Sequence, residues 1–158
     1  MDIISKDHFK TIKLINRLTD YQVCYGGSLE DYLLLGNAEK PVGDLDVLIY
    51  GHDIIGVLDG YFDLTPSKPS YFNNFMSEKF TKYNTVINNI KIDFLVSDGH
   101  MMVNNFIDSI INGTLIRHRN FDYKKQILKE WVELSVPNDM WAHDKFSKIL
   151  DRYENFNN

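Results

Sequence analysis

Apolar residues in the first 60 positions recur at helical spacing in some stretches and form continuous strand-like runs in others. Helical spacing over 6–18 predicts a first helix, and the short apolar segment 22–25 predicts a strand that leads into a glycine pair. The segment 29–35 again has a helical pattern. The apolar run 45–50 predicts a buried strand, and a short helix is expected over 53–58. The predicted order is therefore helix, strand, helix, strand, helix.

A long loop and a hairpin are predicted next. The stretch 61–78 mixes prolines, serines and aromatic residues, which is typical of an ordered loop and suits a flap over a site. Two strand-like segments, 80–87 and 90–96, flank Asn88-Asn89, a residue pair suited to a two-residue hairpin turn. These two strands are therefore expected to pair antiparallel.

The last third of the chain is expected to be helical. Helices are predicted over 101–111, 122–134 and 139–153, with Pro137 breaking the chain between the last two. The whole succession of elements implies a mixed sheet rather than a uniformly parallel one. The predicted fold class is α/β (α+β), with a mixed β-sheet flanked by helices and a C-terminal helical segment.

Length and composition agree with one compact domain and exclude several classes of protein. With 158 residues, 44% hydrophobic and 25% charged, the chain can bury one core and is not mainly disordered. We expect residues 1–100 to form the core and residues 101–158 to pack on it. No apolar run approaches the roughly 20 residues that span a bilayer, and the first ten residues contain no apolar signal region. The single cysteine, Cys24, excludes an internal disulfide, so a cytoplasmic location is expected.

The distribution of charge limits the partners that the chain can bind. A net charge of −5 argues against an extended nucleic-acid-binding surface. The densest basic cluster contains Arg117 and Arg119, which could contact a phosphate or an acceptor, or could lie solvated beside a helix. Lys124 falls on a predicted helix with neighbouring glutamates, so an ordinary surface position is expected for it.

A glycine pair between the predicted strand 22–25 and the following helix is the first candidate for function. Gly26 and Gly27 let the backbone turn sharply and let a ligand approach the main-chain amides. The N-terminus of the next helix would also attract an anion. Ser28 could instead cap that helix, with Asp31 in capping-box position, in an ordinary strand–turn–helix connection. The pattern alone leaves both interpretations open.

Three aspartates stand where a carboxylate is unfavourable without a cation. Asp44 and Asp46 are two residues apart at the start of a predicted strand, so their side chains are expected on one face, where each raises the pKa of the other. Mg²⁺ prefers such oxygen ligands. Asp93 interrupts a further apolar strand. The alternatives are a solvated turn for the first pair, and an exposed edge strand or neutralisation by Lys91 for Asp93.

The glycine pair, the Asp-Leu-Asp segment and the later aspartate occur in the order found in the DNA polymerase beta-type nucleotidyltransferase superfamily, which they resemble. The matching segments are Tyr25-Gly26-Gly27-Ser28, Asp44-Leu45-Asp46 and Asp93. The stretch 26–36 is also similar to a segment of CCA-adding enzymes and bacterial poly(A) polymerases, and the pattern resembles small stand-alone phage nucleotidyltransferases. Glu30 departs from the CCA-adding family, which has Arg there, and no counterpart of that family's base-reading motif is found.

This resemblance implies the transfer of a nucleoside monophosphate from an NTP to an acceptor hydroxyl, with release of pyrophosphate. It implies two Mg²⁺ ions, with Mn²⁺ as an alternative, that bind the triphosphate and activate the hydroxyl. The acceptor is left open between a small molecule, a protein and a short RNA end, and no membrane partner is expected. The alternative function is a catalytically inactive nucleotide-binding or regulatory protein on the same fold. The implied catalytic and metal-binding residues are Asp44, Asp46 and Asp93, and the implied phosphate-binding residues are Gly26, Gly27 and Ser28.

Overall fold

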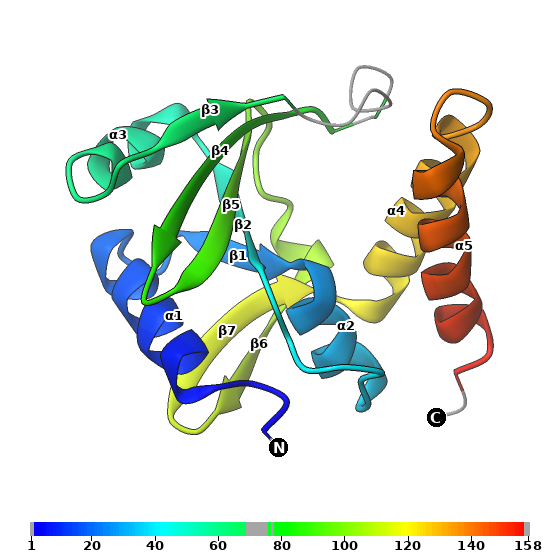
Figure 1. Ribbon diagram of the computed structural model, residues 1–158, viewed down its shortest axis with the longest axis horizontal. Helices are drawn as coiled ribbons and strands as arrows, with labels where there is room; N and C mark the ends of the chain where they lie inside the picture. Colours follow the sequence, from blue (N-terminus) through cyan, green and yellow to red (C-terminus); the bar gives the residue numbers. More distant parts are fainter. Residues whose placement is uncertain (1, 69–75, 77, 157–158) are drawn as a thin grey trace.

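Helices and strands alternate through the first half of the chain, as the computed structural model shows (Figure 1). The structure describes residues 2–68, 76 and 78–156. The elements are α1 (Lys6–Leu18), β1 (Val23–Gly26), α2 (Gly27–Leu35), β2 (Leu45–Tyr50), α3 (His52–Asp59), β3 (Thr65–Ser67), β4 (Phe80–Ile87), β5 (Ile90–Ser97), the 3₁₀ turn η2 (Val103–Asn105), β6 (Phe106–Ile111), β7 (Thr114–Arg119), α4 (Phe121–Leu134) and α5 (Met140–Glu154).

The main sheet contains, among the described residues, five strands in the order β1-β2-β5-β4-β3. Strands β2 and β5 run parallel, and every other neighbouring pair is antiparallel. The expected mixed sheet flanked by helices is thus confirmed. The predicted hairpin is confirmed as well: Asn88 and Asn89 both adopt positive φ angles, 53° and 63°, as a type I′ turn between antiparallel strands requires.

The two faces of the sheet pack against different helices because side chains alternate along each strand. On β2, Leu45, Val47 and Ile49 join a buried cluster with residues of α1 and α3. Leu48 points to the opposite face, where it packs with Cys24 and with residues of α4 and α5. Figure 1 shows α1 and α3 on one side of the molecule and the α4–α5 pair on the other.

The prediction of a helix over 101–111 is wrong. Residues of this stretch form β6, which pairs antiparallel with β7 in a separate two-stranded sheet. The pair Asn112-Gly113, which suits a helix end, instead forms the hairpin turn with φ angles of 49° and 69°. An Asn-Gly pair also suits a two-residue hairpin turn, because both residues tolerate the left-handed conformation. Strand β7 buries Ile116 against the main core.

The last two predicted helices are confirmed, and the predicted flap is not tested. Helices α4 and α5 begin and end within about a residue or two of the predicted bounds, and their N-caps are the side chains of Asn120 and Asp139. The loop predicted over 61–78 contains the short strand β3, and its positions 69–75 and 77 lie outside the described residues, so the flap stays a prediction. None of the helices in the described part of the chain is long and apolar enough to cross a membrane.

Candidate active site

The first glycine of the pair and two of the three aspartates meet in one row across the sheet. Gly26 on β1 lies opposite Asp46 on β2, and Asp46 lies opposite Asp93 on β5. Neighbouring strands are about 4.8 Å apart, so these three positions are direct neighbours. Tyr25 and Val47 fall in the next row and point to the α1–α3 core. The row therefore faces the side of the sheet that α4 and α5 cover.

The lack of a side chain at Gly27 leaves room for the carboxylate of Asp46. Its φ angle is +65°, a conformation that glycine adopts without strain. A Cβ atom built at this position would lie 2.5 Å from Oδ2 of Asp46, closer than such atoms can approach. Glycine at this position thus leaves the space that the carboxylate occupies. The start of α2 can therefore lie directly against Asp46 of β2.

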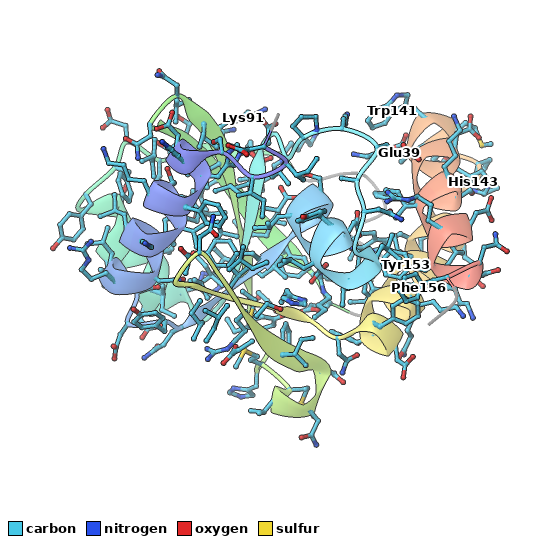
Figure 2. The ribbon with its side chains drawn as sticks, turned by 90° about the horizontal axis from the view of Figure 1, so that it is seen from below. Glu39, Lys91, Trp141, His143, Tyr153 and Phe156 are labelled. Carbon is cyan, nitrogen blue, oxygen red and sulfur yellow. The ribbon has the colours of Figure 1, made fainter. Side chains whose placement is uncertain are left out.

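Asp93 is buried in the middle of the sheet rather than on an exposed edge. Its strand β5 lies between β2 and β4, and only 8% of the residue is exposed. Oδ1 of Asp93 is buried and has no hydrogen-bond partner among the described residues. Oδ2 lies 3.8 Å from Nζ of Lys82 on β4. Lys91 is exposed at the hairpin end of β5 (Figure 2), so the cation beside Asp93 is Lys82 and not Lys91.

The charges around Asp46 shift its ionisation. Burial and, after it, the nearby charge of Asp93 raise the pKa of Asp46 from 3.8 to about 6, although Lys124, Lys82 and Lys145 act to lower it. Two repelling carboxylates, one with a buried unpaired oxygen, form a donor set that suits a hard divalent cation. The residues present therefore fit Mg²⁺ or Mn²⁺ at this position of the sheet.

Asp44 and Ser28 lie at the rim of this site. Asp44 is exposed and stands one residue before β2. In the described residues no three side chains of His, Cys, Asp or Glu converge closely enough to hold a metal ion. The structure thus pairs Asp46 with Asp93, whereas the role of Asp44 as a further ligand stays a prediction. Ser28 is exposed in the first turn of α2, next to backbone N–H groups that the helix leaves unpaired.

The capping-box interpretation of Ser28 is wrong. Helix α2 begins at Gly27, its N-cap is Gly26, and no side chain caps it. Asp31 does not return to the helix N-terminus, because its Oδ1 accepts a hydrogen bond of 2.6 Å from the Tyr153 hydroxyl on α5. The Ser28 hydroxyl is therefore not committed to the helix cap.

The two arginines of the basic cluster have different environments. Arg117 is partly exposed, and its guanidinium donates to Asp108 at 2.9 Å and to the Tyr21 carbonyl at 2.7 Å. Arg119 is only 2% exposed and lies beside the glycine pair, with Nη1 3.4 Å from where a Cβ of Gly26 would stand. The interpretation of both residues as one solvated cluster is therefore wrong for Arg119.

A buried ionic network joins α2 to β7, α4 and α5. Glu30, which is fully buried, accepts from Nη1 of Arg119 at 3.0 Å and from its backbone N–H at 2.7 Å. Nζ of Lys124 lies 3.0 Å from Glu30 and 3.5 Å from Asp31. Tyr153 on α5 completes the network through Asp31 (Figure 2). Burial acts to raise the pKa of Glu30, but Lys124 and Arg119 outweigh it and hold this pKa below its usual range.

This network overturns the expectation for Lys124 and was missed in the sequence. Lys124 is 2% exposed rather than on an ordinary surface, because it neutralises two acids inside the molecule. Glu30, which stands where the CCA-adding family has Arg, is fully buried and directs its carboxylate to Arg119. The available signal was Glu30-Asp31 in an otherwise apolar helix, which requires cations from elsewhere in the chain.

Comparison with known proteins relates this geometry to solved structures. No protein-family model and no curated protein matches the chain. A Thermotoga maritima protein described as a nucleotidyltransferase superposes with a TM-score of 0.59 at 13% identity, over 92% of this chain and 95% of that chain. An antigenic nucleotidyltransferase-like protein from Paracoccidioides brasiliensis gives a TM-score of 0.53 at 12% identity, over 95% and 77%. ANT(2″)-Ia, in complex with adenylyl-2″-tobramycin, gives 0.52 at 11%, over 92% and 96%.

The chain has the nucleotidyltransferase fold. Identities of 11–13% establish the fold alone, so the roles of individual residues must be argued from this chain. Within the nucleotidyltransferase fold, the Gly26–Asp46–Asp93 row provides the geometry from which a function can be proposed.

The raised pKa of Asp46 predicts a pH-dependent stability of this nucleotidyltransferase fold. A carboxyl whose pKa is higher in the folded state than its ordinary 3.8 stabilises the fold at low pH, and that contribution is lost as the pH rises to about 6. A rise of about two pKa units corresponds to a change of up to about 3 kcal/mol in the free energy of unfolding. In chelator-containing buffer, Asp46→Asn should therefore unfold at higher urea than the native chain at pH 7, with the difference vanishing near pH 4. Equal stability of the two proteins at both pH values would contradict the raised pKa.

The close approach of Gly27 to Asp46 predicts a substitution effect that a matched control isolates. Gly27 and Gly36 both have positive φ, but a Cβ at Gly36 would meet nothing within 4 Å. Both Gly→Ala changes should cost about 1 kcal/mol for the left-handed backbone. Gly27→Ala should cost at least about 1 kcal/mol more, because the methyl group displaces the Asp46 carboxylate. Urea unfolding measures both losses, and equal losses would show that the contact is unimportant.

Proposed function

We propose that the protein is a Mg²⁺-dependent nucleotidyltransferase that transfers a nucleoside monophosphate from an NTP to an acceptor hydroxyl and releases pyrophosphate. The observation that carries the proposal is the direct lateral pairing of Asp46 with Asp93 beside Gly27. A structural protein gains nothing from two repelling carboxylates in the middle of a sheet, whereas a metal-dependent transferase requires them. The nucleotidyltransferase fold of the chain supports this general kind of activity.

Asp46 and Asp93 are the proposed principal metal ligands, with Asp44 as a third. The unpaired Oδ1 of Asp93 and the carboxylate of Asp46 supply free oxygen donors. When bound, Mg²⁺ would neutralise triphosphate charge and lower the pKa of the attacking hydroxyl. Asp93, the most buried of the three, is proposed to orient that hydroxyl and to accept its proton.

The phosphates are proposed to bind at the first turn of α2. Gly27 is only half-buried at the start of the helix, and the exposed Ser28 hydroxyl can donate to a phosphate oxygen beside the backbone N–H groups of the first turn. Gly26 is buried and is proposed to shape the turn that places these groups. The positive charges of Lys124, Lys82 and Lys145, which act on Asp46, also favour a triphosphate there.

The acceptor is proposed to be a small molecule, since ANT(2″)-Ia was solved with an adenylylated small molecule. A protein or a short RNA end remains the alternative acceptor. Arg117 lies outside this arrangement because it pairs with Asp108.

One contact favours a second candidate, a catalytically inactive nucleotide-binding protein. Nζ of Lys82 lies 3.8 Å from Asp93 and so offers a positive charge where a metal ion would otherwise bind. In such a protein, NTP would bind without metal, and Lys82 would replace the ion. The two candidates differ in whether Mg²⁺ is needed for binding.

Thermal unfolding with each of the four NTPs, with and without Mg²⁺, tests the proposal. A nucleotide at about a hundred times its Kd stabilises the fold by roughly 2.7 kcal/mol, which raises the Tm by about 5–10 °C for a domain of this size. We expect this shift only with one or more NTPs and Mg²⁺ together, followed by pyrophosphate release when hydroxyl-bearing acceptors are added. A shift that is equal without Mg²⁺ would favour the inactive protein, and no shift with any NTP would refute both.

A further inference from the structure

A cavity with an acidic and aromatic lining lies at the far end of β2 from the candidate active site. It has a volume of about 240 Å³, and its wall includes Tyr50, Glu78, His100, Phe106 and Tyr123. Tyr50 and Asp46 project from the same face of β2, four residues apart, which corresponds to about 13 Å along the strand. The cavity therefore lies beyond the proposed metal site on the same side of the sheet.

Three aromatic rings of the cavity wall contact one another edge to face. The rings of Tyr50 and Phe106 are 5.7 Å apart between centroids, with an interplanar angle of 78°. The rings of Phe106 and Tyr123 are 6.0 Å apart, with an angle of 67°. Because such contacts fix the rings relative to one another, the π-electron surfaces around the cavity are held in place.

Glu78 supplies a negative charge that forms no direct ion pair with the described residues. Its carboxylate accepts a hydrogen bond of 3.2 Å from the Tyr123 hydroxyl. The Tyr50 hydroxyl is also buried beside this carboxylate, and burial together with the charge of Glu78 raises the pKa of Tyr50. The charge of Arg119 also acts on Glu78, but the direct partner of this guanidinium is Glu30.

The chemistry of this lining selects a cation. A carboxylate and two phenol oxygens accept hydrogen bonds from a primary ammonium group, and aromatic surfaces attract a cation within about 6 Å of their centroids. A neutral planar base would satisfy the rings but leave the charge of Glu78 uncompensated. We propose that this cavity is a binding site for a primary ammonium group of an organic amine, with Glu78 as the charge partner and Tyr50 as a second acceptor. The proposal does not depend on nucleotide transfer.

Titration of the whole chain with 1,5-diaminopentane at low ionic strength, followed by calorimetry, tests this site. The neutral 1,5-pentanediol has the same length and serves as the control ligand. We expect saturable binding of the diamine and none of the diol. Glu78→Gln should weaken binding at least tenfold, and Tyr50→Phe several-fold. Glu133→Gln, which removes an exposed charge of α4 outside the cavity wall, should leave the affinity unchanged.

Each contrary outcome overturns the proposal. Equal affinity of the native chain and Glu78→Gln would show that the diamine binds elsewhere, and absence of saturable binding would show that the cavity takes no amine. Binding of the neutral nucleoside adenosine in place of the diamine, lost in Tyr50→Ala, would make the cavity a base-binding site. Tyr50→Phe removes a single oxygen, so its result remains readable if a larger substitution disturbs the fold.

Discussion

Asp46→Asn and Asp93→Asn are each expected to lower nucleotidyl transfer by at least about a thousandfold. Asparagine keeps the shape of the side chain but removes the charge that holds a divalent cation, and such an ion supplies several kcal/mol of transition-state stabilisation. A loss of about 4 kcal/mol corresponds to the thousandfold effect. Pyrophosphate release under saturating NTP and Mg²⁺ measures the change.

The control for these variants is Asp59→Asn, an exposed carboxylate of α3 on the opposite side of the sheet. This change should leave the rate of transfer within about twofold. Asp44→Ala belongs with the first group, because Asp44 is proposed as a third ligand. Retention of transfer in Asp46→Asn would reject the metal-dependent mechanism. Retention of transfer in Asp44→Ala alone would show that Asp46 and Asp93 hold the metal ion without Asp44.

Arg119→Met is expected to destabilise the fold by about 3–5 kcal/mol, the usual loss when one partner of a buried ion pair is removed. The change leaves Glu30 inside the protein with Lys124 as its single remaining cation. It also removes the guanidinium that lies against the Trp131 ring at 5.9 Å. Urea unfolding at pH 7 measures the loss.

The matched control is Arg117→Met on the same strand. Arg117 pairs with Asp108 at the surface, with the carboxylate side chain 43% exposed, so this change should cost less than about 1 kcal/mol. Similar losses for the two variants would mean that the buried network does not stabilise the fold. A loss of Mg²⁺-dependent NTP binding in Arg119→Met at temperatures where it remains folded would show that Arg119 also positions the glycine pair.

Much of the sheet could be predicted from the sequence because its central strands are continuous apolar runs. The predicted strand over 45–50 coincides with β2, and the Asn88-Asn89 hairpin is in place. The hairpin at Asn112-Gly113 was missed because an Asn-Gly pair is also typical of helix ends, and local pattern does not separate the two. Only the pairing of β6 with β7 shows that this Asn-Gly pair forms a hairpin turn and not a helix end.

The candidate site could be predicted only in part. Asp46 and Asp93 were identified because each carboxylate interrupts an apolar strand, but their direct pairing depends on the register of β2 and β5, which sequence pattern does not fix. The cation beside Asp93 comes from β4, and the cations around Glu30 come from β7 and α4. Such contacts between distant segments leave no periodic trace in the sequence.

The separation of Glu30 from its partner along the chain has a consequence for synthesis. Arg119 follows Glu30 by 89 residues. At translation rates of about 5–20 residues per second, the ribosome adds this stretch in roughly 4–18 s. During that time the acidic turn of α2 has no counter-charge and cannot be buried without a large penalty. The nascent chain should therefore remain protease-sensitive at α2 until β7 and α4 have emerged.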